Sequence, residues 1–290
     1  MAYSFDIYLI QALHGIVYGM LLFLVAAGLT LVFGMMGVLN FAHAGFYMLG
    51  AYFGYSVVAW SGNFWLSLIV APIGVGICGG FVERFLLRKV HTFGHAYELL
   101  LTFGVFLATG EIVKWFWGNA PLSVQIPPSL SGSLSILGAT YPYYRLFILA
   151  CGVAVLILLA LFILKTRIGI TVRAAVSDAG MVGALGTNVP VVFLGVYAVG
   201  SALAALGGVI AGPFLSTYPG MGLDILTDVF VVIVVGGFGS VFGAVVASLM
   251  IGVLQSYGIL LLPKFALVFE YVLMAIILIV RPNGLFGEKE

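Results

Sequence analysis

Hydrophobic residues run almost without interruption along this chain, and charged residues are confined to a few short segments. No Asp, Glu, Lys or Arg occurs between Ile7 and Val82, between Ala179 and Leu223, or between Val229 and Pro263. A soluble domain carries roughly 25% charged residues, which keep its surface hydrated. This chain has 7% charged and 63% hydrophobic residues, so we expect most of its surface to face lipid.

The first charge-free run, residues 7–82, is too long for one membrane crossing. As a single helix it would extend about 114 Å, whereas a hydrocarbon core of about 30 Å needs about 20 residues. Residues 34–40 and 60–63 combine Gly with Asn and are suited to break it. We predict spans near 8–34, 43–60, 64–87, 97–117, 143–165, 190–212 and 264–281, and a longer segment, 225–260, that is interrupted at 236–240.

The pattern therefore predicts an all-α polytopic membrane protein of about eight transmembrane helices plus a short discontinuous half-helix, in a single domain over residues 1–290. Lys and Arg occur in clusters that we expect in the cytoplasm, because short loops rich in these residues stay on that side. The clusters are Arg84, Arg88 and Lys89; Lys165, Arg167 and Arg173; and Arg281 with Lys289. The N-terminus then lies outside.

The last two cation clusters both lie in the cytoplasm only if an even number of crossings separates them. Residues 228–239 must then count as a crossing, although about 12 residues cannot span the membrane unaided. We predict a half-helix that is buried by its neighbours. If it re-enters instead, one terminus is on the opposite side. The uncharged segment 118–142 and a turn at 213–228, whose only charges are Asp224 and Asp228, suit the outer side.

Glycine accounts for 39 of the 290 residues. Pairs of Gly four residues apart share a helix face and let another helix approach closely. We expect this role for Gly15/Gly19, Gly50/Gly54, Gly76/Gly80, Gly208/Gly212 and Gly239/Gly243. The clusters that break helices have a second interpretation, because broken helices near the midplane expose backbone dipoles that can line a transport path.

Few ionisable residues lie within the predicted spans. Glu111 and Lys114 are one helical turn apart and are expected to pair. Glu270 is a lone deep carboxylate and a candidate functional residue, because such groups are costly in lipid. We expect His14 and His43 to be hydrogen-bonded structural residues. The loop containing His91 and His95 has no neighbouring Cys or second acid that would suggest a metal site.

Several classes of function have no support in the sequence. There is no catalytic set, no HExxH zinc motif and no GxxxxGK[ST] loop for ATP phosphates, and no basic stripe for nucleic acid. We predict no metal, no cofactor and no enzymatic activity. Cys78 and Cys151 lie inside predicted spans as small apolar residues, without a disulfide. The N-terminal segment is not a cleaved signal peptide and is expected to be retained.

Residues 165–190 form the longest polar interruption. We predict a helix of small residues from Arg173 to Leu185, ending near Gly186, with Asn188 opening the next span. Such a helix has a low profile and could seat in a groove of another protein. The alternative is an ordinary amphipathic segment at the membrane interface.

Four segments resemble the permease subunits of branched-chain amino-acid ABC transporters, and the shorter, LivH-type permease is the nearer match. They are GLTLVFGMMGVLNFAHAGFYMLGAY (28–52), VRAAVSDAGMVGALGTNV (172–189), DVFVVIVVGGFGSVFGAVVASLMIGVL (228–254) and RPNGLFG (281–287). The resemblance implies a subunit of the bacterial inner membrane that forms a heterodimer with a homologous permease. Two cytoplasmic ATP-binding subunits would power it, and a periplasmic binding protein would deliver Leu, Ile or Val.

The resemblance also implies site residues. The ATPase-coupling helix would contain Arg173, Ala174, Ala175, Asp178, Gly180, Gly183 and Gly186. Arg173 stands where the general pattern of such helices has Glu, and Gly180 comes one residue late. Near the first break, His43 is followed by Ala44 where the family commonly has Gly. Candidates for the translocation path are Gly34, Gly37, Asn40, His43, Gly236, Gly237, Gly239, Ser240 and Glu270.

Two alternative functions remain open at this point. Related permeases move urea or short amides, and nothing in the sequence distinguishes these cargoes from aliphatic amino acids. An ion-coupled secondary transporter is a different class, and it would usually show several buried carboxylates or cations. Only Glu270 is a candidate for that role.

Overall fold

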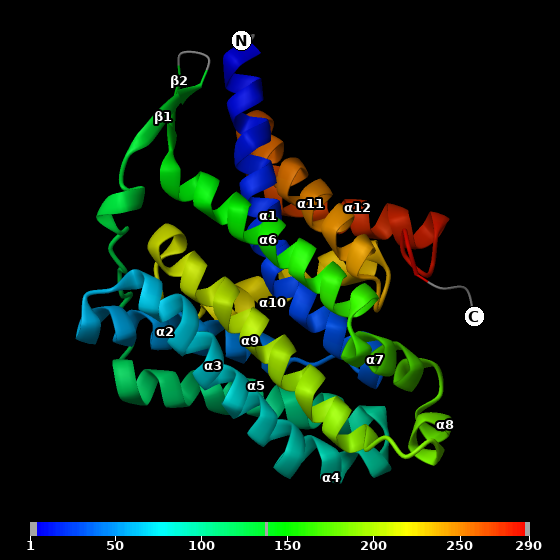
Figure 1. The fold of residues 1–290 in the computed structure, drawn as a ribbon. Coiled ribbons are helices and arrows are strands. Elements are labelled where there is room, and N and C mark those ends of the chain that lie inside the picture. The colour runs from blue at the N-terminus through cyan, green and yellow to red at the C-terminus, as the bar shows by residue number, and fades with distance from the viewer. Residues whose placement is uncertain (1–4, 137–138, 288–290) are drawn as a thin grey trace.

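The chain is a bundle of long helices in the computed structural model, which describes residues 5–136 and 139–287 (Figure 1). The helices are α1 (Phe5–Met36), α2 (Ala42–Ser61), α3 (Phe64–Val82), α4 (Arg88–Val90), α5 (His95–Trp117), α6 (Tyr143–Lys165), α7 (Arg167–Ser177), α8 (Ala179–Ala184), α9 (Val189–Leu215), α10 (Met221–Gly236), α11 (Val241–Leu261) and α12 (Ala266–Val280). A π-helical turn (Glu83–Leu87), 3-10 turns (His91–Phe93, Pro128–Leu130, Pro263–Phe265) and strands β1 (Ser133–Ile136) and β2 (Ala139–Pro142) complete it.

Seven helices of the described residues are long and apolar enough to cross a membrane: α1, α3 with its extension to Phe93, α5, α6, α9, α11, and α12 with its preceding turn. The 20-residue helix α2 is less apolar, but much of its first half is buried. It packs closely against α9, since a Cβ atom on Gly50 would lie 2.7 Å from the carbonyl carbon of Ala205 and one on Gly54 would lie 3.0 Å from a methyl carbon of Val209. With the 16-residue α10, the predicted eight spans and a half-helix are confirmed.

Helix α1 is the centre of the bundle. In its most apolar stretch of 18 residues 83% is buried, whereas in the corresponding stretches of the other spans at most 44% is buried. It lies antiparallel to α11, and glycine removes the side chains that would separate the two backbones. A Cβ atom on Gly15 would lie 2.6 Å from the Cα atom of Val253, and one on Gly19 would lie 2.9 Å from that of Leu249. The predicted role of this glycine pair in helix contact is confirmed.

The outer end of the bundle carries a feature that the sequence did not reveal. Strands β1 and β2 form an antiparallel hairpin in which Ser133 pairs with Pro142 and Ile136 with Ala139. Leu122, upstream of the hairpin, pairs through its backbone with Thr217, which follows α9. The hairpin leads directly into α6, and its Tyr141 ring stacks on His14 of α1.

Helix α10 crosses the bundle and does not re-enter. Its first turn follows Thr217 at the outer end, whereas the turn after it places Gly239 against Gly34 at the opposite end of α1. At 1.5 Å per residue α10 is about 24 Å long, shorter than a hydrocarbon core of about 30 Å. Seven consecutive residues, 231–237, are buried. Neighbouring helices therefore supply the cover that a short crossing requires.

Two predictions about local structure are wrong. The turn expected at 213–228 is partly helical, because α10 already begins at Met221 and so contains Asp224 and Asp228. Gly239 does not share a helix face with Gly243, because it lies in the turn with a φ of 77° before α11 begins.

The helix expected from Arg173 to Leu185 is also divided. Helix α7 ends at Ser177, and the Asp178 carboxylate accepts a hydrogen bond from the Met181 backbone N–H at 2.9 Å, capping α8. An Asp side chain at this position satisfies an N–H group that has no partner within the helix. Gly186 ends the segment with a φ of 87°.

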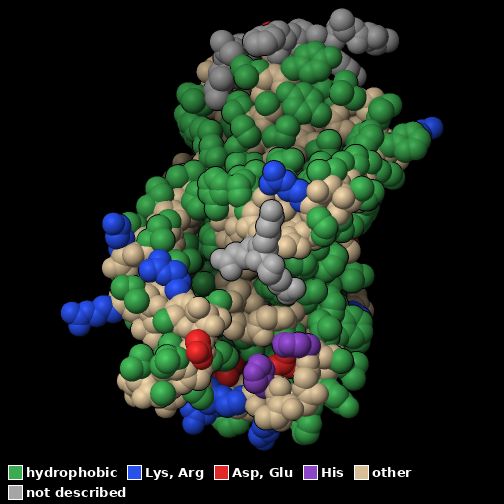
Figure 2. Space-filling view, turned by 90° about the vertical axis from the view of Figure 1, so that its right-hand side faces the viewer, with side chains coloured by type: hydrophobic (Ala, Val, Ile, Leu, Met, Phe, Trp, Pro, Cys, Tyr) green, Lys and Arg blue, Asp and Glu red, His purple; other side chains and the backbone are tan. Residues whose placement is uncertain are grey.

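The outer surface of the bundle is suited to lipid. On α3, Ile69, Ile73, Ile77 and Phe81 recur every four residues and are all at least 58% exposed. In Figure 2 most of the visible Lys and Arg side chains gather over the lower half of the molecule, and hydrophobic side chains dominate its upper half. We call the end of the bundle that carries most of the cations the inner end, and the opposite end the outer end. Lys289 lies outside the described residues.

Several sequence expectations are confirmed within the bundle. The Lys114 ammonium group lies 2.6 Å from the Glu111 carboxylate. Cys78 is exposed on α3 and Cys151 half-buried on α6, and both are free thiols.

Thiol labelling tests the orientation. Ser131 and Ser177 are both exposed and lie at opposite ends of the bundle. In a variant without Cys78 and Cys151, we expect an impermeant thiol reagent added outside intact cells to label Ser131→Cys and to leave Ser177→Cys unlabelled. Inside-out vesicles should reverse the result. Labelling of both positions from the outside would show that the cation clusters do not set the orientation.

Candidate functional site

The two predicted helix breaks meet at the inner end of the bundle. One lies between α1 and α2 and the other between α10 and α11. A Cβ atom on Gly34 would lie 3.4 Å from the Cα atom of Gly239, and the rings of Phe33 and Phe238 are 4.7 Å apart. Gly37, with a φ of 68°, completes the first break. Two segments about 200 residues apart in sequence therefore form one contact, which we call the glycine junction.

The C-terminal segment closes the junction from the other side. The backbone N–H groups of Leu285 and Phe286 donate hydrogen bonds of 2.9 and 3.0 Å to the carbonyl groups of Val235 and Gly236. Gly237 has a φ of 98°, and a Cβ atom on it would lie 2.8 Å from the Cα atom of Gly287. The RPNGLFG segment thus satisfies carbonyl groups that the end of α10 would leave without partners.

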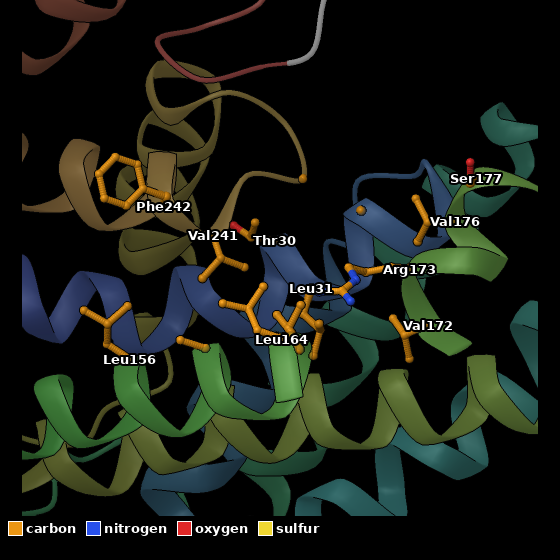
Figure 3. A pocket seen from close by; sticks show the side chains of 14 residues that line it. Thr30, Leu31, Leu156, Leu164, Val172, Arg173, Val176, Ser177, Val241 and Phe242 are labelled. Carbon is orange, nitrogen blue, oxygen red and sulfur yellow. The ribbon is translucent and has the colours of Figure 1, made fainter. Parts of the chain in front are cut away.

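A groove of about 910 Å³ lies beside the glycine junction, between α1, α6, α7 and α11 (Figure 3). Gly34 and Gly239 line it together with Arg173 of α7, whose side chain points toward Leu31 of α1 in Figure 3. The rest of the wall is largely apolar, with side chains such as Leu31 and Leu156. The groove therefore joins two predicted sets, the path candidates and the coupling segment.

Of the nine predicted path residues, only Gly34 and Gly239 line this groove. His43 is buried, and its Nε2 atom lies 2.9 Å from the Val25 carbonyl oxygen, as expected for a structural histidine. Asn40 is buried near Tyr197, and neither side chain forms a hydrogen bond within 3.5 Å. The Ser240 hydroxyl accepts a hydrogen bond of 3.0 Å from the Gly243 N–H and caps α11.

Glu270 belongs to a separate polar cluster nearer the outer end. It is 2% exposed on α12, which packs against α10, and on α10 the Asp228 carboxylate accepts a hydrogen bond of 2.6 Å from the Tyr18 hydroxyl. The expectation of a lone deep carboxylate is therefore wrong. The sequence signal was the spacing of Asp224 and Asp228, four residues apart, but nothing in the sequence pointed to Tyr18, 210 residues away.

A small cavity of about 60 Å³ adjoins this cluster. It is lined by Tyr18, Tyr47, Leu215, Tyr218, Met221, Asp224, Ile225 and Asp228. The Tyr218 hydroxyl donates a hydrogen bond to the Asp224 carboxylate, and this bond, together with burial, raises the pKa of Tyr218 to about 12. Tyr218 is therefore a neutral donor at physiological pH.

The predicted coupling residues lie on α7, on α8 and in the turn after them. Arg173, Ala174, Asp178, Gly180, Gly183 and Gly186 are exposed. Ala175 is 3% exposed, so it packs inside the chain and is not a surface contact. Large apolar side chains are exposed along the same segment, including Val176, Met181 and Leu185, the last at 78%.

These features agree with the comparison with known families. The profile of the family described as "Branched-chain amino acid transport system / permease component" matches residues 11–280. The chain belongs to this family. This permease is a multi-pass membrane protein of the LivH type, and the sequence resemblance is confirmed.

Named relatives cover the permease almost end to end. The high-affinity branched-chain amino acid transport system permease protein BraD of Pseudomonas aeruginosa is 28% identical over 98% of this chain and 97% of its own. LivH of Escherichia coli K12 is 27% identical over 100% of this chain and 99% of its own. The probable permease LivH of Methanocaldococcus jannaschii is 25% identical over 94% and 90%. No solved structure matches this permease significantly.

Substitution at the glycine junction tests whether the permease uses it. Gly239→Leu places a side chain at a φ of 77° and against Gly34, at a backbone cost of about 1 to 3 kcal/mol. We expect a loss of transport of at least tenfold with a normal amount of protein in the membrane. Gly104→Leu is the control, because nothing lies within 4 Å of a Cβ atom there. Equal transport by both variants would show that the junction has no role.

Proposed function

We propose that this permease is one membrane-spanning subunit of an ABC importer that carries the branched-chain amino acids Leu, Ile and Val across the bacterial inner membrane. Its relatives are named as branched-chain amino acid transport permeases over nearly their full length. The mostly apolar groove suits an aliphatic side chain. A binding protein would supply most of the affinity, so the path itself needs only weak contacts.

The observation that carries the proposal is the position of the glycine junction. It lies at the inner end of α10, and the acidic cavity lies at the outer part of the same helix. Both junction glycines also line the groove. The proposed path enters at the cavity, follows α10 and leaves through the groove. Contact between Gly34 and Gly239 closes it at the inner end.

Helices α7 and α8 are the proposed docking segment for an ATPase. Their apolar side chains Val176, Met181 and Leu185 are at least half exposed, and the capped break at Asp178 presents them on two short helices. Arg173 is part of this segment and also lines the groove. A movement of α7 caused by the ATPase would therefore reach the groove directly.

The proposed assembly contains a second, homologous permease, two cytoplasmic ATP-binding subunits and a periplasmic binding protein. The need for ATP-binding subunits follows from the absence of a GxxxxGK[ST] loop in this chain. The groove is open along one side, and the second permease is the proposed missing wall.

An ion-coupled transporter is the second candidate, because Asp228 and Glu270 place two carboxylates inside the bundle. The energy source distinguishes the two. We expect the purified chain to hydrolyse no ATP above a mock preparation, and leucine uptake by the complete assembly to require ATP and to survive ionophores. Uptake that ionophores abolish and that needs no ATP would favour the ion-coupled transporter. Uptake of urea or short amides in place of leucine would correct the cargo.

A bulky side chain on α8 tests the docking segment. The only atom within 4 Å of a Cβ atom on Gly180 is an Asp178 carboxylate oxygen, at 3.3 Å, so Gly180→Trp should fold normally. We expect it to abolish transport and co-purification of the ATPase, since overpacking a close contact costs about 1 to 3 kcal/mol. Gly110→Trp, at another open position, is the control. Ala175→Trp is unsuitable because that side chain is buried. Normal ATPase binding by Gly180→Trp would leave α7 and α8 as an interfacial segment.

A further inference from the structure

Thr30 of α1 has a buried hydroxyl group without a hydrogen-bond partner. The residue is 1% exposed, and its Oγ1 atom forms no hydrogen bond within the described part of the chain. A threonine hydroxyl commonly donates to a carbonyl group three or four residues earlier. Five other threonines of this chain make such a bond: Thr102, Thr109, Thr166, Thr171 and Thr227. Thr30 does not, and it lines the groove beside the glycine junction, so its hydroxyl group is free to bind a molecule there.

The N-terminus of α11 adds backbone donors to the same groove. Ser240 is the N-cap, and its hydroxyl group accepts the hydrogen bond of the Gly243 N–H. Val241 and Phe242, the first two residues of the helix, line the groove (Figure 3). The first N–H groups of a helix have no partner within it, and the helix dipole makes this end attractive to anions. Two unsatisfied N–H groups and a free hydroxyl group therefore belong to one groove.

Arg173 adds a full positive charge. It is the only charged residue among those that line the groove, and it forms no ion pair with any residue that the structure describes. Its side chain points toward Leu31, the residue after Thr30 in α1 (Figure 3). A guanidinium group presents several N–H donors in one plane, which suits a carboxylate or a phosphate. The groove thus offers donors and positive charge with no acidic side chain to neutralise them.

Two kinds of anion reach such a groove within a membrane: the phosphate of a phospholipid and the carboxylate of a small molecule that crosses the protein. The accessibility of Thr30 favours the carboxylate. A phospholipid phosphate carries a substituent on each side, whereas a carboxylate ends its molecule and can reach a hydroxyl group that is 1% exposed. Thr30 is also one helical turn before Gly34, which contacts Gly239 in the glycine junction.

We propose that the N-terminus of α11, Thr30 and Arg173, which we call the carboxylate site, bind the carboxylate group of the amino-acid cargo as it passes the glycine junction. The inference rests on the proposed function. A carboxylate has two oxygens with about four lone-pair positions, so it can accept hydrogen bonds from the Thr30 hydroxyl and from backbone N–H groups while it faces Arg173. The aliphatic side chain of the cargo then lies against the apolar wall of the groove.

The carboxylate site also connects the cargo with the proposed docking segment. Thr30 and the N-terminus of α11 belong to the bundle, whereas Arg173 belongs to α7. A movement of α7 would withdraw the positive charge and leave only neutral donors around the carboxylate. Because charge-assisted hydrogen bonds are about twice as strong as neutral ones, this movement would release the cargo.

A binding experiment on the purified chain in phosphatidylcholine nanodiscs tests the site directly. The probe is 4-methylpentanoate, which is leucine without its ammonium group, and the thermal unfolding temperature is measured as its concentration rises. The neutral 4-methylpentanamide controls for apolar binding and for partition into lipid, and sodium chloride controls for ionic strength. We expect only 4-methylpentanoate to raise the unfolding temperature with a saturable dependence. An equal response to the amide would overturn the assignment to a carboxylate.

Anionic lipid separates the two sources of an anion. The titration is repeated in nanodiscs that contain phosphatidylglycerol, in enough sodium chloride to screen the charge of the membrane surface. We expect the concentration of 4-methylpentanoate that gives half of the effect to change less than twofold. Loss of the response in phosphatidylglycerol would show that a lipid phosphate occupies the site, and would overturn its assignment to the cargo.

Side-chain variants locate the effect. Thr30→Val removes the hydroxyl group and should weaken 4-methylpentanoate binding at least threefold, whereas Thr30→Ser keeps the group and should bind like the wild type. Without the probe, Thr30→Val should unfold at the wild-type temperature or above it, because it removes a buried polar group that has no partner. Arg173→Gln should weaken binding at least tenfold. Arg84→Gln, at an exposed arginine outside the groove, is its control. Wild-type binding by Thr30→Val and Arg173→Gln would refute the site.

A proline at the start of α11 tests the backbone donors. Val241→Pro removes one N–H group, and proline is well tolerated at the first position of a helix. Ser240, the preceding residue, already has the extended conformation that proline requires of it, with φ −89° and ψ 105°. We expect Val241→Pro to weaken 4-methylpentanoate binding at least threefold, and Val241→Ala, which keeps the N–H group, to bind like the wild type. Equal binding by the two variants would remove the helix N-terminus from the site.

Transport by the complete assembly separates this inference from the proposed function. With the binding protein saturated with leucine, we expect the Thr30→Val assembly to move leucine at least threefold more slowly than the Thr30→Ser assembly, with equal co-purification of the ATPase. Equal transport by the two variants would refute the carboxylate site and leave the proposed function intact. Binding of 4-methylpentanoate that depends on Thr30, without leucine transport by the wild type, would refute the proposed function alone.

Discussion

The close backbone contact between α1 and α11 is the constraint on which the other contacts depend. Lipid is as apolar as the side chains, so hydrophobic burial does not hold transmembrane helices together, and close van der Waals contact must do so. Gly15 and Gly19 allow that contact at the outer half of α1, and Gly34 allows the approach of Gly239 at its inner end. A side chain at Gly15 or Gly19 would force the backbones of α1 and α11 apart, whereas a Cβ atom on Gly34 would only reach ordinary contact with Gly239.

The interrupted helix α10 depends on this arrangement. A helix of about 24 Å exposes unsatisfied carbonyl groups within the membrane unless protein covers its end. The C-terminal segment provides that cover through hydrogen bonds from Leu285 and Phe286. The end of α10 is therefore stabilised by hydrogen bonds from another segment of the chain, whereas α1 forms its backbone hydrogen bonds within the helix.

Charge is distributed along α10 and its surroundings in a way that matches an inward path for a zwitterion. Asp224 and Asp228 lie toward the outer end of α10, apolar residues 229–236 follow, and Arg173 lines the groove that borders the junction. Arg173 also belongs to the proposed docking segment. One side chain therefore connects the surface available to an ATPase with the groove, so that coupling needs no long chain of intervening contacts.

The sequence alone determined the membrane environment, the number of helices and their approximate ends, because these follow from the lengths of apolar segments and the positions of Gly, Asn and charge. It also located both breaks and the polar segment that we propose as the docking site for an ATPase. It missed the division of that segment at Asp178, where a single cap competes with helix continuation, and the hairpin at 133–142. Only the tertiary structure brought Gly34 to Gly239 and Tyr18 to Asp228. These pairs are about 200 residues apart, and periodicity within one helix cannot specify which distant face it will meet.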